Sequence, residues 1–374
     1  MKAGWEIKTI GEVCEIRSGR NQKEVENPSG KYPIYGSGGI MGYADDYLCE
    51  AGATIIGRKG SINNPIFVET KFWNVDTAFG FSPKETIIPK FLFYFCKGFN
   101  FQAMNKGTTI PSLVKTDLLQ IRIPVPSLHE QQRIVGLLDR EFAKIDTLKA
   151  NAEKSFQAAK DFFRAALEME LDYRAMDTTT LLSLCQSIVD CPHSTPIKSP
   201  EKTNFPCIRT SELKDGDISW ATMQYVSEEE YKKRITRLQP NAGDIVYGRE
   251  GTIGDAVLLP PGYSFCLGQR TMLFRPNLSL VDPKYLLYCV ISPFVYSQAL
   301  SKNTGCGVAH VNVADVKQFL IPIPKEKDQQ VRIVSRLDDL NTRCKGLREN
   351  YQKTLTLCDD LKQSLLRKAF NGEL

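Results

Sequence analysis

Two long stretches of the chain carry apolar residues at alternating helical spacing, with almost no glycine or proline. The first runs from about Leu128 to Leu171, and the second occupies the last fifty residues. In the second stretch the three- and four-residue steps continue over four heptads, which is typical of a coiled-coil seam. At 1.5 Å per residue, each stretch predicts a helix of roughly 60 Å.

A long helix with one apolar stripe is not stable alone in water, so each helix needs a partner. We expect the two helices to pack antiparallel on each other, for example with Phe142 near Leu361, because large residues then face smaller ones. The predicted seam contains Leu138, Phe142, Ile145, Leu148, Phe156, Phe162, Leu337, Leu340, Leu347, Tyr351, Leu361 and Leu365. Two unrelated helices that associate between chains are the alternative.

The same motif precedes both helices. Pro124–Ile134 and Pro322–Ile333 each contain Pro-x-Pro, a pair of glutamines and an isoleucine, separated by about half the chain. Short β-type runs between glycine-rich turns fill the remainder, followed in each half by an amphipathic helical segment beginning at Pro89 or Pro283. Such a period indicates a duplicated plan. The sequence predicts a mixed α and β fold with two similar domains, at 1–126 and 173–324. Two long antiparallel coiled-coil helices, at 127–172 and 325–374, separate them with pseudo-twofold symmetry.

The glycine-rich turns carry the candidate chemistry. Gly57–Ser61 (Gly-Arg-Lys-Gly-Ser) corresponds to Gly248–Thr252 (Gly-Arg-Glu-Gly-Thr), and Asn105–Gly107 corresponds to Asn303–His310. Such turns bring backbone N–H groups and cations to phosphates, while flanking polar side chains reach base edges. The candidate nucleic-acid contacts are Tyr35, Ser37, Arg58, Lys59, Ser61, Lys106, Thr108, Arg249, Thr252, Gln269, Arg270 and His310. Any single one of them also fits an ordinary surface turn.

Composition adds few constraints. The 374 residues are 42% hydrophobic, which is enough for two cores, and the net charge of +5 permits nucleic-acid binding without demanding it. Eleven cysteines without a C-x-x-C pair predict free thiols in a reducing cytoplasm. No apolar run approaches the length of a membrane span, so we expect a soluble cytoplasmic protein. No set of residues indicates a catalytic, metal or cofactor site.

The whole chain resembles the specificity subunit of type I restriction–modification systems. The paired helix entries Pro124–Ile134 and Pro322–Ile333 are similar to those of the family, and Leu365–Leu374 is similar to its closing signature. Tyr32–Gly42, Lys71–Thr77, Cys191–Pro196 and Gly248–Gly254 resemble segments of its target recognition domains. One departure is the end of the first helix, Phe163–Leu171, which lacks the closing signature.

The resemblance implies a non-catalytic subunit with two target recognition domains, each reading one half of a bipartite, asymmetric site in double-stranded DNA. The helices would set the spacer and dock two modification subunits, which carry S-adenosylmethionine and methylate adenine. Restriction subunits using ATP and magnesium would complete the nuclease. This chain would hold no cofactor. A coiled-coil scaffold with two protein-binding domains is the alternative function, and an enzyme with an unrecognised site is a third.

Overall fold

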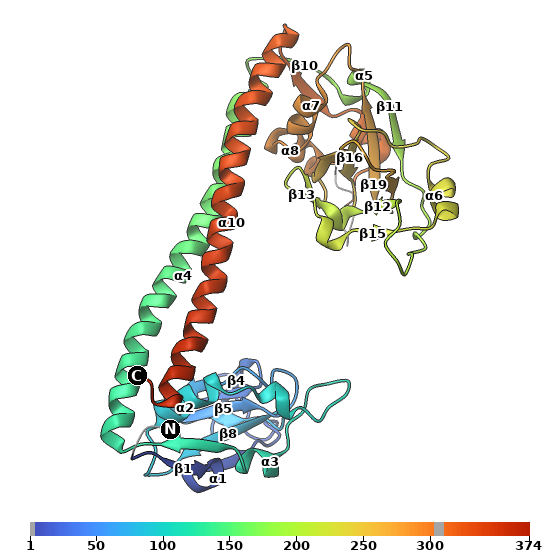
Figure 1. The fold of residues 1–374 in the computed structure, drawn as a ribbon. Coiled ribbons are helices and arrows are strands. Elements are labelled where there is room, and N and C mark those ends of the chain that lie inside the picture. Colours follow the sequence, from blue (N-terminus) through green and yellow to red (C-terminus); the bar gives the residue numbers. More distant parts are fainter. Residues whose placement is uncertain (1–3, 303–309) are drawn as a thin grey trace. The chain divides into compact units, whose positions relative to one another are not determined.

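The computed structural model describes residues 4–302 and 310–374, which form two compact units (Figure 1). The first unit joins the chain up to Lys154 with Tyr351–Leu374, and the second contains Ser155–Asn350. Each unit therefore combines a globular domain with one stretch of each long helix. These helices are α4 (Leu128–Glu170) and α10 (Lys327–Asn371).

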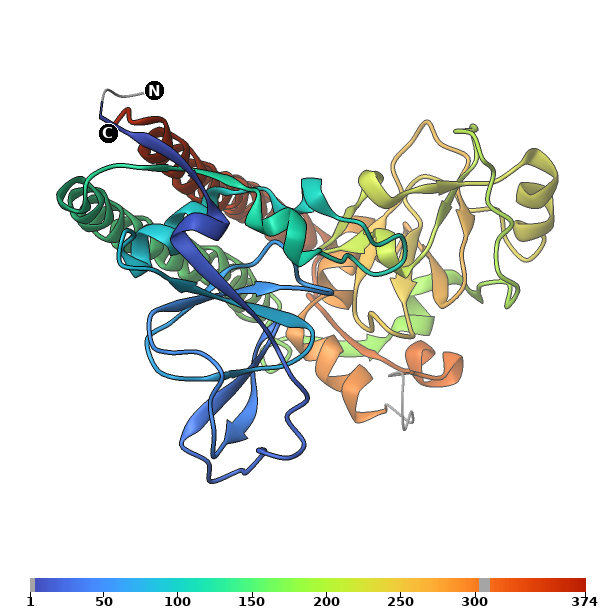
Figure 2. The same cartoon turned by 90° about the horizontal axis from the view of Figure 1, so that it is seen from below.

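The domain of the first unit, which Figure 2 shows from below, contains a four-stranded and a three-stranded sheet. The four-stranded antiparallel sheet has the order β2 (Cys14–Ser18), β8 (Ala78–Pro83), β5 (Ala53–Gly57) and β6 (Ile66–Val68). The three-stranded sheet has the order β4 (Gly39–Ala44), β3 (Tyr32–Gly36) and β7 (Trp73–Asn74), with β3 parallel to β7. A separate ladder pairs β1 (Glu6–Thr9) with β9 (Arg122–Val125). The helical elements are α1 (Ile10–Val13), α2 (Pro89–Gly98), the 3-10 helix η1 (Phe101–Met104) and α3 (Lys115–Leu119).

The domain of the second unit repeats this topology. Its four-stranded sheet has the order β11 (Cys185–Asp190), β19 (Thr271–Pro276), β16 (Ile245–Gly248) and β17 (Ala256–Leu258). Its three-stranded sheet has the order β15 (Gln224–Tyr225), β12 (Pro206–Ile208) and β18 (Cys266–Leu267), again with one parallel pair. β10 (Asp177–Thr180) pairs with β20 (Leu320–Ile323). The helices are α5 (Leu181–Leu184), α6 (Glu228–Arg234), α7 (Pro283–Val290), α8 (Pro293–Ser301), α9 (Val313–Lys317), and the 3-10 helices η2 (Thr210–Glu212) and η3 (Trp220–Thr222).

The second domain carries a hairpin that the first domain lacks. Between β12 and β15 lies a hairpin of β13 (Leu213–Lys214) and β14 (Asp217–Ile218). At the corresponding place between β3 and β4, the first domain has only the short turn at Ser37 and Gly38. The internal repeat predicted from the sequence is thus confirmed in strand order, with this hairpin and α6 among the additions to the second copy.

The repeated glutamine motif attaches each long helix to its domain. The side-chain oxygen of Gln131 accepts a hydrogen bond from the backbone N–H of Ile88, and that of Gln330 accepts one from Asp282, both at 2.8 Å. Each amide also donates to a backbone carbonyl of the same domain. Both glutamines are at most 1% exposed. Because an unpaired buried amide is costly, these bonds fix where each helix meets its domain.

A second attachment is also duplicated. A lysine and a tyrosine of the domain helix bind one aspartate of the long helix: Lys90 and Tyr94 of α2 bind Asp139, and Lys284 and Tyr288 of α7 bind Asp338. Burial, then the Asp139 carboxylate, raises the pKa of Tyr94. The same two causes raise the pKa of Tyr288. Both phenols therefore remain protonated donors at neutral pH.

Within each unit the stretches of α4 and α10 run antiparallel. In the first unit Lys149 binds Asp359 at 2.7 Å and Lys362 binds Asp146, so residue numbers fall on one helix as they rise on the other. In the second unit Arg336 binds Glu170 at 2.5 Å. The helices thus pair within the chain, as expected.

Burial agrees with the predicted seam at some positions and contradicts it at others. Leu138, Phe142, Ile145 and Leu337 are buried, and Phe156, Leu340, Tyr351 and Leu365 are half-buried. Leu148, Phe162, Leu347 and Leu361 are 46–59% exposed, which contradicts their assignment to the seam. The residue that directly follows each of these four is half-buried instead: Lys149, Phe163, Arg348 and Lys362.

The correction has a simple geometric cause. Burial on both helices follows a regular seven-residue repeat. Each repeat has two buried or half-buried positions, and the second lies four residues after the first. Moving one residue along a helix turns the side chain by about 100°. The predicted contact between Phe142 and Leu361 is replaced by one with Lys362, whose ammonium lies 5.1 Å from the Phe142 ring centroid. The stems of lysine and arginine cover apolar surface while their charged ends reach water.

No helix in the parts of the chain that the structure describes combines the length and apolarity needed to cross a membrane.

Candidate nucleic-acid interface

In the first unit, two loops meet beyond the end of β5. Lys59 and Ser112 form an isolated β-bridge, and the N–H of Leu113 donates to the carbonyl of Arg58 at 2.9 Å. The N–H of Gly60 donates to the carbonyl of Pro111 at 3.0 Å. Gly60 has a φ of +79°, in the left-handed region that favours glycine. The backbone therefore holds the Arg58–Ser61 loop against the loop that contains Lys106 and Thr108.

These loops bring six of the predicted contacts together. Lys59, Ser61, Lys106 and Thr108 are exposed, and Arg58 is half-buried with its guanidinium donating to the carbonyl of Asp76 at 3.2 Å. Ser37 lies against the same loop, because a Cβ added to Gly57 would lie 3.0 Å from the Ser37 Cβ. Tyr35 is placed differently: it is half-buried in β3, with its ring centroid 5.6 Å from that of Phe72.

The cations of this cluster have few carboxylate partners. Among residues 4–302 and 310–374, no carboxylate lies within 4.0 Å of Lys59 or Arg58, and Lys106 approaches Asp117 only to 3.8 Å. Lysine and arginine side chains exposed in this way can bind phosphate oxygens without first breaking an ion pair. The first domain therefore presents a positively charged loop pair.

The equivalent arginine of the second domain has a different environment. The Nε of Arg249 donates to Asp190 at 3.0 Å, its Nη2 donates to the same carboxylate at 3.3 Å, and its Nη1 lies 3.2 Å from the Nδ1 of His310. The side chain is only 7% exposed. Arg249 thus holds the loop in place, and the geometry does not favour it as a phosphate contact.

Two other predicted residues of the second domain lie beside Glu250, which stands where the first domain has Lys59. Arg270 pairs with Glu250 at 3.2 Å, and His310 lies 3.8 Å from it. Gln269 is engaged with the domain itself, donating to the carbonyl of His193 at 2.6 Å. Thr252 is exposed, and its backbone N–H donates to the carbonyl of Glu250 at 3.1 Å.

The two domains therefore share a backbone but not a charge pattern. The N–H of Arg58 donates to the carbonyl of Thr77 at 2.8 Å, and the N–H of Arg249 donates to that of Arg270 at 3.1 Å. Sequence reasoning missed Asp190, because it is far from Arg249 along the chain and belongs to no motif. Of the predicted loop Asn303–His310, residues 303–309 lie outside the described residues.

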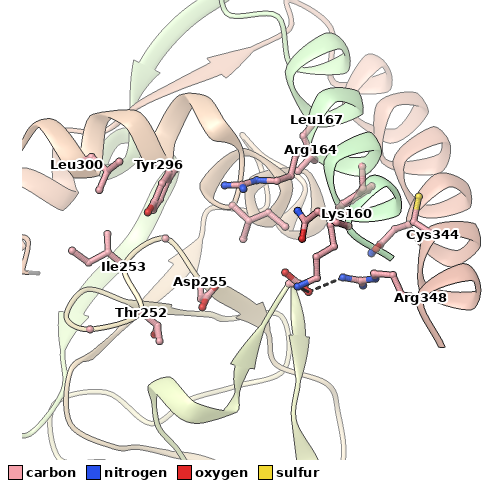
Figure 3. A pocket seen from close by; sticks show the side chains of 17 residues that line it. Lys160, Arg164, Leu167, Thr252, Ile253, Asp255, Tyr296, Leu300, Cys344 and Arg348 are labelled. Carbon is pink, nitrogen blue, oxygen red and sulfur yellow. Dashed lines mark hydrogen bonds and ion pairs between the residues drawn. The ribbon is translucent and has the colours of Figure 1, made fainter. Parts of the chain in front are cut away.

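A cavity of about 470 Å³ lies behind the Gly251–Asp255 loop of the second unit (Figure 3). Thr252 and Ile253 line one side, and Lys160 and Arg164 project from α4 on the other. Burial, and then the nearby Asp215, raises the pKa of the Asp255 carboxyl to about 6. Within the described residues no group of three histidine, cysteine, aspartate or glutamate side chains is arranged to hold a metal ion, and the cysteines are free thiols.

A family model and similar curated proteins point to the same protein family. A family model described as the type I restriction modification DNA specificity domain matches residues 2–154 and 201–357. The specificity subunit of the Escherichia coli type I restriction enzyme EcoBI is 23% identical, over 86% of this chain and 73% of the relative. That of EcoDI, also from Escherichia coli, is 22% identical over 99% and 88%.

Solved structures show the same fold. A chain from a study of assembly and conformational transition of the type I restriction–modification system superposes with a TM-score of 0.76, at 18% identity. The superposition covers 100% of this chain and 99% of that chain. The HsdS subunit from Thermoanaerobacter tengcongensis superposes with a TM-score of 0.53 at 19% identity, covering 100% and 98%.

Proposed function

This chain belongs to the type I restriction–modification DNA specificity family, and we propose that each of its two domains reads one half of a bipartite, asymmetric DNA site. The observation that carries the proposal is the duplicated domain whose equivalent loops differ in charge. A shared scaffold with different loop side chains suits two readers of different sequences. Arg58, Lys59 and Lys106 would contact phosphates of one half-site, and Arg270 is the exposed arginine at the corresponding loop of the second domain.

We further propose that α4 and α10 form a coiled coil that fixes the spacer between the half-sites and docks two modification subunits. The seven-residue repeat of buried positions supports the coiled coil. Exposed leucines support docking: in the first unit Leu148, Leu357 and Leu361 are 48–64% exposed on the helix pair. Apolar side chains left uncovered on a helix pair are typical of a surface that another subunit buries.

In this proposal the chemistry belongs to the partners. The modification subunits would bind S-adenosylmethionine and methylate adenine, and restriction subunits would use ATP and magnesium. This chain would supply sequence recognition without catalysis. The mildly positive net charge of +5 is consistent with a DNA-binding surface completed by the partners.

Sequencing of methylated adenines in cells tests the proposal. Cells that express this chain together with its modification subunit should carry methylation at one split motif, and removal of this chain alone should abolish it. Methylation that is unchanged without this chain would contradict the proposal. Salt dependence separates it from a protein scaffold, because phosphate contacts make the affinity of the assembled complex for DNA fall steeply with salt.

A further inference from the structure

The hairpin that only the second domain possesses reaches both long helices of its unit. At its tip, the Asp215 carboxylate accepts a hydrogen bond from Arg348 of α10 at 2.6 Å and lies 3.9 Å from the ammonium of Lys160 of α4. Asp217, two residues on, pairs with Lys345 of α10. Figure 3 shows Lys160 and Arg348 pointing from the two helices towards this end of the cavity.

The hairpin is firmly part of the domain. Leu213 is 2% exposed and belongs to the domain core, and Gly216 forms a bridge with Val257 at the edge of the four-stranded sheet. Asp215 has a φ of +50° and Gly216 a φ of +86°, so a tight left-handed turn presents the carboxylates to the helices. The tip of the hairpin therefore moves together with the domain.

The ion pairs form a second attachment, distant from the first. The domain is attached to α10 at Asp338, and Arg348 is ten residues further along the helix, which is about 15 Å. Between these points lies the cavity of about 470 Å³, lined by Phe163, Cys344 and Ile253 among others. Because of this cavity, the ion pairs hold the outer part of the interface, beyond the apolar core that the domain shares with Leu167, Ile333 and Leu337 of the helices.

We propose that the β13–β14 hairpin restrains the angle of the second domain on the helix pair and thereby restricts the gap length that the protein accepts between its half-sites. This inference rests on the proposed function. Adding one base pair to the gap moves a half-site by about 3.4 Å and rotates it by about 35°. Without the hairpin pairs, a domain held at Gln330, at Asp338 and by the core it shares with both helices could follow such a change by rocking into the cavity, whereas one also held at the hairpin could not.

The test removes charge without altering the turn. Asp215→Asn keeps a residue that tolerates the left-handed conformation but weakens the bonds to Arg348 and Lys160. Arg348→Gln removes the main pair from the helix side. Asp359→Asn is the matched control, since its pair with Lys149 at 2.7 Å is similarly exposed but lies between the helices of the first unit.

Each variant is assembled with its modification subunits, and methylation rates are measured on duplexes with the wild-type gap or one base pair more or less. Asp215→Asn and Arg348→Gln should each lower the preference for the wild-type gap up to about fivefold, in keeping with exposed ion pairs. Asp215→Asn combined with Asp217→Asn should lower it further. The half-site sequences should stay the same, and Asp359→Asn should match the wild type.

The outcomes separate the two proposals. If the wild-type complex methylates no split motif, the proposed function fails and this inference fails with it. If the wild type reads a split motif and the hairpin variants keep its gap preference, only the inference is wrong. A changed half-site sequence would also overturn it, because the hairpin would then act through the reading surface.

Discussion

At the residue scale, one arginine in each domain shows how far a motif determines a role. Arg58 and Arg249 follow equivalent strands in similar glycine-rich turns, and the sequence predicts the same contact for both. The structure leaves Arg58 half-buried beside exposed cations but places Arg249 against Asp190. The position of the turn was predictable from glycine spacing. The pairing with Asp190 was not, because it depends on β11 and β16 lying on either side of β19 in one sheet.

This difference predicts that two substitutions in the second domain lower the free energy of unfolding by different amounts. Arg249→Ala leaves the half-buried Asp190 carboxylate without its main partner and should lower the free energy of unfolding by about 1.5–3 kcal/mol. Arg270→Ala, which removes an arginine that is 52% exposed, should lower it by at most about 1 kcal/mol. Urea unfolding of the full chain measures both. Equal effects would show that Arg249 is not a structural residue.

At the element scale, the existence, ends and antiparallel course of the long helices followed from the sequence, whereas their facing residues did not. At several positions the prediction places a leucine in the seam where the structure half-buries the charged residue that follows it, as at Leu347 and Arg348. Apolarity alone could not show this, because lysine and arginine stems also line the pair. The anchoring glutamines Gln131 and Gln330 were recognised as a repeated motif, but their buried hydrogen bonds required the structure.

Two leucines of α10 test the corrected seam. Leu337 is fully buried and Leu347 is 46% exposed. Leu337→Ala should lower the free energy of unfolding by about 2–5 kcal/mol because it leaves a cavity. Leu347→Ala should change it by less than about 0.5 kcal/mol, as exposed substitutions do. Thermal or chemical unfolding of the two variants compares them directly. A larger loss of stability at Leu347 than at Leu337 would support the seam predicted from the sequence.

At the scale of the whole molecule, two domains with one topology and different loop charges predict independent reading of the half-sites. The double substitution of Arg58 and Lys59 by alanine should weaken methylation at sites of all sequences and reduce the salt dependence of DNA binding, because two phosphate contacts are lost. The base preference attributed to the second domain should remain the same. Methylation profiling with the variant measures this, and altered preference in both half-sites would argue against independent readers.

The duplicated attachments have a consequence for how such proteins change over time. Each domain meets its helix through the same buried glutamine and the same lysine, tyrosine and aspartate. A recombination event that exchanged one whole domain for another would therefore find a fitting attachment already in place. On the proposed function, such an exchange would give a new combination of half-sites in a single genetic step, while the helices would be inherited unchanged.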